Sequence, residues 1–98
     1  MKIEVLEEAK EDLISGYHFY EKQSPRLGSY FLDSLYSDID SLLLYAGTHR
    51  AILGSHRCLS RRFPFAIYYR IENETIRVRA VLDCRQHPAL IRQRQQGT

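Results

Sequence analysis

The residues with the clearest chemical capacity are arginines in the second half of the chain. Four of them, with one histidine after the last predicted strand, form a candidate catalytic set: Arg61, Arg62, Arg79, Arg85 and His87. RNA is cleaved when its own 2′-hydroxyl attacks the neighbouring phosphate, and a protein assists by supplying a base, an acid and cationic stabilisation of the phosphorane. These residue types suit that reaction if they converge in the fold. The alternative is that the arginines are surface charges and His87 is a polar residue before a proline.

Other kinds of catalytic or metal site have no signal in this sequence. The chain has no glycine-rich phosphate loop, no nucleophile elbow and no paired carboxylates on the predicted strands. Cys58 and Cys84 belong to no CxxC or zinc spacing, and we interpret both as reduced core residues. A metal site that combines them with His56 and His87 lacks ligand spacing. We therefore expect neither a metal nor a cofactor.

Charge is divided unevenly along the chain. Residues 1–48 hold nine acids and four bases, whereas residues 49–98 hold ten arginines and three acids. A division of this size indicates two surfaces with different partners, or else chance clustering on solvated faces.

Length and composition indicate one soluble domain over residues 1–98. The 98 residues are 44% hydrophobic and 27% charged, which is ordinary globular composition. No apolar run approaches the ~20 residues of a membrane span. An acidic residue occurs as early as Glu4, and the first residues lack the apolar core of a signal peptide, so we expect a cytoplasmic location.

The hydropathy pattern predicts an α+β fold of order β-α-α-β-β-β, a helical hairpin packed on a small antiparallel sheet. Residues 2–6 alternate as a strand, and residues 7–23 repeat apolar positions at helical spacing. Ser24 and Pro25 suit an N-cap and first helical position for a second helix that ends before Gly47. We expect a loop over 48–56, strands over 57–61, 65–72 and 75–85, and a flexible tail over 92–98. The first strand must join the sheet from a distance in sequence.

The last two strands can be paired from sequence alone. A turn over residues 72–75 places Ile71 opposite Ile76, and continuing the register pairs Tyr69 with Val78, Ile67 with Ala80 and Phe65 with Leu82. On the other face this register places Arg70 opposite Arg77 and Tyr68 opposite Arg79. Like charges directly opposite are destabilising, so this face either serves an anionic partner or lets its arginines extend into water.

Two surfaces are candidates for binding a partner protein. One is the basic sheet face with residues near it: Arg57, Tyr68, Arg70, Arg77, Arg79 and Arg85. The other is the side of the second helix that carries Leu32, Tyr36 and Leu43, which widens the apolar stripe and suits a partner helix; a sheet edge open to strand addition is a further possibility. The alternative is that these helix residues fill the core. The isoelectric point near 8.6 is low for a nucleic-acid binder, which favours a protein partner over sequence-specific DNA binding.

The pattern resembles the RelE/ParE toxin superfamily over residues 3–94. The helical part of the resemblance lies in residues 9–13, 17–21 and 27–31. The strand part is residues 62–71, Arg-Phe-Pro-Phe-Ala-Ile-Tyr-Tyr-Arg-Ile, followed by Ile76-x-Val78-x-Ala80-Val81-Leu82-Asp83-Cys84-Arg85-x-x-Pro88. The long helical hairpin and the 62–71 strand look more like the ParE branch.

The resemblance implies a toxin of a bacterial type II toxin–antitoxin module, bound by its antitoxin as a hetero-oligomer. The ParE branch inhibits DNA gyrase by protein contact, and the RelE branch cleaves mRNA on the ribosome. Relatives carry two arginines and an acid before the proline, whereas only Arg85 matches here, so the second arginine's role does not carry over. His87 keeps the ribosome-dependent nuclease as the alternative. A non-toxic relative that only binds antitoxin is a third.

Overall fold

A computed structural model describes the chain except residues 48–50, 53–54, 87 and 97–98. Its elements, in chain order, are β1 (Lys2–Val5), α1 (Glu7–Glu21), α2 (Leu27–Asp40), α3 (Leu42–Tyr45), β2 (Ala51–Ile52), β3 (Ser55–Leu59), β4 (Phe65–Glu72), β5 (Thr75–Asp83) and α4 (Pro88–Gln96). The predicted α+β class is confirmed, and so is the order of the first strand, the two long helices and the three later strands.

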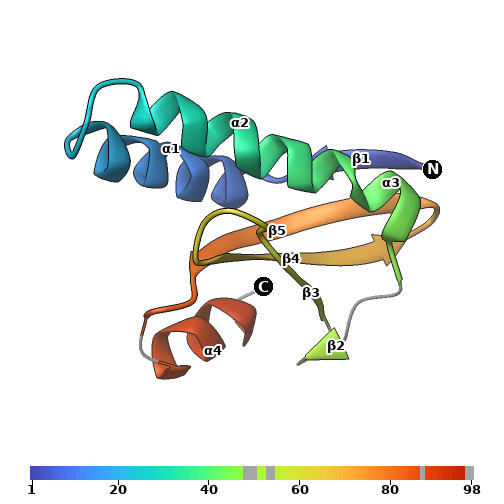
Figure 1. Cartoon of the computed structure of the whole chain (residues 1–98). Helices are drawn as coiled ribbons and strands as arrows, with labels where there is room; N and C mark the ends of the chain where they lie inside the picture. The colour runs from blue at the N-terminus through green and yellow to red at the C-terminus, as the bar shows by residue number, and fades with distance from the viewer. Residues whose placement is uncertain (48–50, 53–54, 87, 97–98) are drawn as a thin grey trace.

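The helical hairpin of α1 and α2 lies on one face of a five-stranded sheet, and α4 lies on the other (Figure 1). The strand order is β1-β5-β4-β3-β2, so β1 joins from a distance as predicted. It pairs with β5 in parallel, and the sheet is therefore mixed rather than wholly antiparallel. A parallel neighbour requires a long crossover, which here is formed by the helices and the intervening strands.

The core between hairpin and sheet is built on aromatic rings and close helix contact. Tyr20 and Phe31 pack with Phe63 and Phe65, with ring centroids 4.9–6.2 Å apart. Gly28 allows α2 to approach α1 closely, because a Cβ there would lie 2.6 Å from the carbonyl oxygen of Tyr17. The hairpin is thus fixed on the sheet, and its outer surface is free to carry charge.

The second helix begins and ends differently from the prediction. Ser24 and Pro25 lie in the turn before it, and the Glu21 carboxylate accepts the backbone N–H groups of Arg26 at 3.0 Å and Gly28 at 2.9 Å. Glu21, at the end of α1, thus accepts N–H groups at the start of α2 that have no partner within that helix, so α2 needs no N-cap side chain of its own. At the other end, the Ser41 hydroxyl donates to the Asp38 carbonyl at 2.6 Å, where α2 gives way to α3.

The β4–β5 register is right near the turn and wrong beyond it. Ile71 faces Ile76, Arg70 faces Arg77 and Tyr69 faces Val78, as predicted. A β-bulge then shifts the ladder, so that the partners become Tyr68–Ala80, Ile67–Val81, Ala66–Leu82 and Phe65–Asp83. The extra residue is Arg79, which therefore does not oppose Tyr68. The predicted pairs Ile67–Ala80 and Phe65–Leu82 are also wrong, because Ala80 and Leu82 lie on the face away from the hairpin.

Two regions predicted as irregular contain regular structure. The expected loop over 48–56 holds β2 and the start of β3, whose strand ends at Leu59 rather than at residue 61. The expected flexible tail is helical through Gln96 as part of α4. Local sequence predicts neither, because both depend on neighbours elsewhere in the chain.

Candidate functional site

The outer face of the sheet, opposite α1 and α2, has an apolar half and a charged half. We call the apolar half the α4-covered patch: Ala66, Tyr68, Ala80 and Leu82. The charged half lies toward the β4–β5 turn and is called the arginine cluster: Arg70, Arg77 and Arg79.

The α4-covered patch is a second small core. Its four residues are at most 6% exposed, and Ile91 of α4 packs against them. Arg57 Nε donates to the Tyr68 hydroxyl at 3.1 Å, and its Nη2 lies 3.5 Å from Cys84 Sγ. The contact with Tyr68 raises the pKa of Arg57. Arg57 and Tyr68, which were predicted to bind a partner, are therefore engaged within the fold, and Tyr68 offers almost no surface.

Helix α4, which lies over this patch, is bound to α1 through Asp12. Asp12 accepts two bonds from the Arg94 guanidinium, at 3.0 Å and 2.9 Å, and one from the Val81 N–H at 3.0 Å. Arg94 Nε also lies 3.4 Å from a Glu8 carboxylate oxygen. Asp12 thus joins α1, β5 and α4. Asp12 belongs to the stretch 9–13 that carries the family resemblance, but no role was predicted for it or for Arg94, because no spacing rule links residues 82 positions apart.

The arginine cluster brings three guanidinium groups to one face. Arg77 is paired with Glu4 at 3.2 Å and with Glu72 at 3.1 Å. Burial, and then the charge of Arg70, lower the pKa of Arg79. Arg70 is half-buried, and its Nε is buried without a hydrogen-bond partner. The like-charge pair predicted from the register is present, and the bulge changes the position of Arg79 in the ladder, so that it no longer faces Tyr68.

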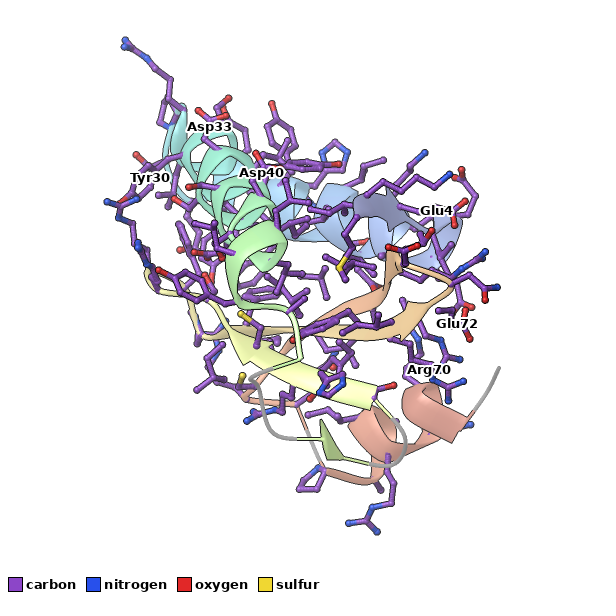
Figure 2. All side chains as sticks on the ribbon, turned by 90° about the vertical axis from the view of Figure 1, so that its right-hand side faces the viewer. Glu4, Tyr30, Asp33, Asp40, Arg70 and Glu72 are labelled. Atoms are coloured by element: carbon purple, nitrogen blue, oxygen red, sulfur yellow. The ribbon has the colours of Figure 1, made fainter. Side chains whose placement is uncertain are left out.

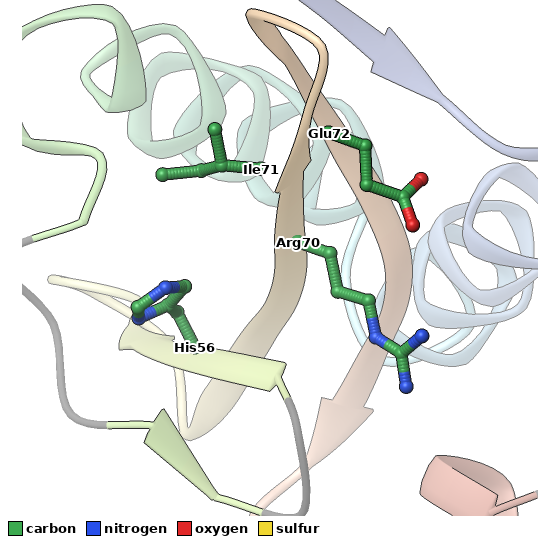
Figure 3. Close-up of a pocket in the computed structure, with 4 residues that line it drawn as sticks. All are labelled: His56, Arg70, Ile71 and Glu72. Atoms are coloured by element: carbon green, nitrogen blue, oxygen red, sulfur yellow. The ribbon is translucent and has the colours of Figure 1, made fainter.

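An open hollow of about 420 Å³ lies beside Arg70 and is lined also by His56, Ile71 and Glu72. Figure 3 shows Arg70 and Glu72 projecting to one side of β4, with Ile71 and His56 to the other. The His56 ring stacks on Tyr69 with centroids 5.1 Å apart. The apolar wall and the imidazole of the hollow are therefore on one side of β4, and the charged ends of Arg70 and Glu72 are on the other.

The residues of the candidate catalytic set do not gather into one described cluster. Arg61 and Arg62 lie in the exposed turn between β3 and β4, and Arg85 lies just after β5, where Cys84 N–H donates to the Pro64 carbonyl at 2.8 Å. Arg85 is held by Asp83, with bonds of 2.6 Å and 2.9 Å. Arg79 instead interacts electrostatically with Arg70, Glu72 and Glu8. His87 lies outside the described residues.

Sequence comparison with protein-family models and with curated proteins gives no match. Structural comparison aligns 83% of this chain with 92% of a chain from "Chromosomal ParDE TA system from P. aeruginosa", with a TM-score of 0.75 and 17% sequence identity. The fold is RelE/ParE-like.

In this ParE-like fold the predicted helix side is divided between core and surface. Leu32 is half-buried and packs against the core, so for this residue the core interpretation holds. Tyr36 and Leu43 are 42% and 53% exposed. They lie toward the end of the hairpin where α3 contacts β1, the edge strand of the sheet. Exposed apolar side chains beside a strand edge suit contact with a protein.

Metal and membrane features can be stated for the described part of the chain. Among those residues no group of three or more histidine, cysteine or acidic side chains is placed to hold a metal ion. Cys58 is buried in the main core and Cys84 packs at the α4-covered patch, so the two lie on opposite faces. No described helix is long and apolar enough to cross a membrane.

Proposed function

We propose that this protein is the toxin of a type II toxin–antitoxin module, held inactive by a cognate antitoxin and acting on DNA gyrase by protein contact. The observation that carries the proposal is the fold, which it shares with a chain of a ParDE system over most of both chains.

Antitoxin binding is supported by surfaces that the fold leaves exposed. Tyr36 and Leu43 offer apolar contact near the edge strand β1, and the arginine cluster offers positive charge on the outer face. A partner that wraps around the edge can use both, forming a hetero-oligomer.

Gyrase is favoured over mRNA by the separation of the candidate catalytic residues. A nuclease needs its acid, base and cations around one phosphate, within hydrogen-bond reach. Here Arg85 is bound by Asp83 just after β5, while Arg79 lies at the middle of that strand and interacts with Arg70.

Two measurements test the proposal. Expression of the chain alone should stop growth, and co-expression of the protein from the adjacent reading frame should restore it. Purified chain should inhibit supercoiling by gyrase and trap cleaved DNA. Normal growth would indicate the non-toxic antitoxin-binding alternative, and unchanged supercoiling at excess chain would refute the gyrase target.

The nuclease alternative has its own readout. Primer extension on translated mRNA should show no new ends that depend on the chain. Cleavage that disappears in Arg85→Ala and His87→Ala would instead assign the RelE-type activity.

A further inference from the structure

Helix α2 has one buried side and one exposed side along its whole length. Phe31, Leu35 and Ile39 lie on the buried side and pack in the main core. The exposed side repeats at intervals of three or four residues, which places its members in one row. We call this row the acidic face of α2: Tyr30, Asp33, Tyr36 and Asp40. Figure 2 shows Asp33 and Asp40 directed away from the sheet, so a partner can reach them without a change in the fold.

The two tyrosines of this face are exposed in a way that favours contact with a protein. Tyr30 is 49% exposed and Tyr36 is 42% exposed. The Tyr30 ring also packs against Phe63 in the turn before β4, with centroids 5.5 Å apart, so its position is fixed before a partner binds. A rigid, exposed tyrosine loses little conformational entropy on binding, and tyrosine is enriched among the residues that contribute most to protein interfaces.

The charge of this face is negative and is not neutralised within the fold. Leu27–Asp40 contains no lysine or arginine, and among the described residues neither Asp33 nor Asp40 forms an ion pair. Asp40 is the last residue of α2, where the helix dipole disfavours a carboxylate. Helix stability therefore does not explain Asp40, whereas contact with a positively charged partner would.

Each aspartate of the face has a tyrosine beside it. Tyr30 and Asp33 are three positions apart, and Tyr36 and Asp40 are four apart; residues at both spacings are neighbours on a helix surface. A guanidinium or ammonium group at such a pair contacts the ring through a cation–π interaction and donates hydrogen bonds to the carboxylate. Acidic peptides and phosphate backbones would be repelled at the same place. The chemistry of the face thus selects a basic protein surface.

We propose that the acidic face of α2 docks the chain on a basic patch of its target protein, with an arginine or lysine of the target bound at each tyrosine–aspartate pair. The inference rests on the proposed function, because it takes DNA gyrase as the target. The target and the antitoxin then bind surfaces of opposite charge, since the arginine cluster suits an acidic partner. Tyr36 also belongs to the apolar contact proposed for the antitoxin, so an antitoxin bound there would cover part of the target surface.

The test is inhibition of gyrase supercoiling by the purified chain and its variants. The double substitution Asp33→Asn with Asp40→Asn should raise the chain concentration needed for half inhibition about 10- to 100-fold, because two charge-assisted contacts are weakened. The matched control, Glu7→Gln with Glu11→Gln, removes two exposed charges of α1 and should change this concentration less than about threefold. A double aspartate variant within about threefold of wild type would overturn the inference and leave the gyrase target intact. A wild-type chain that does not inhibit gyrase would overturn both.

Two measurements on the double aspartate variant separate target binding from folding and from antitoxin binding. Because Asp40→Asn removes an acid from the C-terminus of α2, the thermal midpoint should rise or stay equal. A lowered midpoint with a matching loss of inhibition would assign the aspartates a structural role and overturn the proposal. Calorimetry with the protein encoded by the adjacent reading frame should give an affinity within about threefold of wild type. A loss of affinity as large as the loss of inhibition would assign the face to the antitoxin and would also overturn the proposal.

The aromatic part of the site has its own variant. Tyr30→Leu keeps an apolar side chain against Phe63 but removes the ring that would contact a cation, and it should raise the half-inhibition concentration about 3- to 10-fold. An unchanged concentration would overturn the proposed contact at Tyr30 and Asp33. Sedimentation of the wild-type chain alone tests a second copy as the occupant. Self-association that the double aspartate variant abolishes, with gyrase inhibition unaffected, would assign the face to a homodimer and overturn docking on the target.

Discussion

Single carboxylates determine how the parts of this molecule are joined. Asp12 connects α1, β5 and α4. Asp38 accepts hydrogen bonds from the Ser60 hydroxyl at 2.7 Å and from the Arg61 N–H at 3.2 Å. Glu21 accepts the N–H groups at the start of α2. Each accepts charge-assisted or backbone bonds that no neighbour in sequence could supply. The acidic first half of the chain is therefore partly structural, and its net charge overstates the acid available to a partner.

Asp12 provides the most direct test of this structural role. Asp12→Ala should lower the free energy of unfolding by about 2–4 kcal/mol, because it leaves the Val81 N–H without its acceptor and leaves the Arg94 guanidinium with only its contact to Glu8. Asp12→Asn keeps an acceptor for Val81 and should cost about half as much. Urea unfolding measures both, with Asp33→Ala on the exposed face of α2 as the control. Equal effects at positions 12 and 33 would contradict the assignment.

The Asp83–Arg85 pair predicts a small dependence of stability on acid pH. Hydrogen bonds from the Arg85 side chain lower the pKa of Asp83. A carboxylate with a lowered pKa in the folded state stabilises the protein above the pKa of the unfolded chain, about 3.9, and this contribution is lost as the pH falls through the folded value. Asp83→Asn should therefore lower the urea midpoint slightly at pH 7 and not at pH 2. A deficit of equal size at both values would show that the pair's charge is not its cause.

At the scale of elements, the contact between α1 and α2 depends on a position without a side chain. Gly28→Ala should destabilise the protein by about 1–3 kcal/mol, because the added Cβ meets the Tyr17 carbonyl oxygen at 2.6 Å and the Glu21 Cβ at 2.9 Å. The helices must separate, and the Glu21 cap must move with them. Thermal unfolding measures the loss. Ser29→Ala, at the exposed neighbouring position, should change stability by less than about 0.5 kcal/mol.

The sequence predicts those elements whose apolar residues recur at the spacing of a helix or a strand. The apolar stripes of α1 and α2 and the apolar run of β4 were sufficient to predict those elements, and the turn between β4 and β5 fixed the register of the pairs nearest to it. The bulge was not predictable, because apolar residues stand on both faces of β5 and a shift by one position still buries them. Helix α4 was not predictable either, because it has few apolar residues and is held by the bond from Arg94 to Asp12, 82 positions earlier. The three arginines of the cluster were predicted on one face, but the pairing of Arg79 with Tyr68 was wrong because of the bulge.

At the scale of the whole molecule, the division of charge follows the two layers only in part. Asp33 and Asp40 lie on α2, away from the sheet, while Arg70 projects on the opposite side near α4 (Figure 2). Glu4, Glu8 and Asp12 belong to the acidic half in sequence, yet they pair with Arg77 and Arg94 of the basic half. Part of the positive charge of the second half is therefore neutralised within the fold at Arg77 and Arg94, and the count of arginines overstates the charge available to a partner.

The two-sided architecture makes a last prediction about α4. The main core contains no α4 residue among its described members, whereas the α4-covered patch depends on Ile91 and on the Arg94 contacts. A chain ending at Gln86 should therefore keep its far-UV circular dichroism apart from one short helix. Its free energy of unfolding should fall by about 2–4 kcal/mol, from the lost burial and the broken Asp12 pair. Because Tyr68, Ala80 and Leu82 would be uncovered, it should also bind the dye ANS more strongly than the whole chain. Leu90→Ala, at a position 55% exposed on the same helix, is the matched control and should change neither property. Dye binding equal to that of the whole chain would mean that α4 does not cover the outer face in solution, and that this half of the sheet is as available to a partner as the arginine cluster beside it.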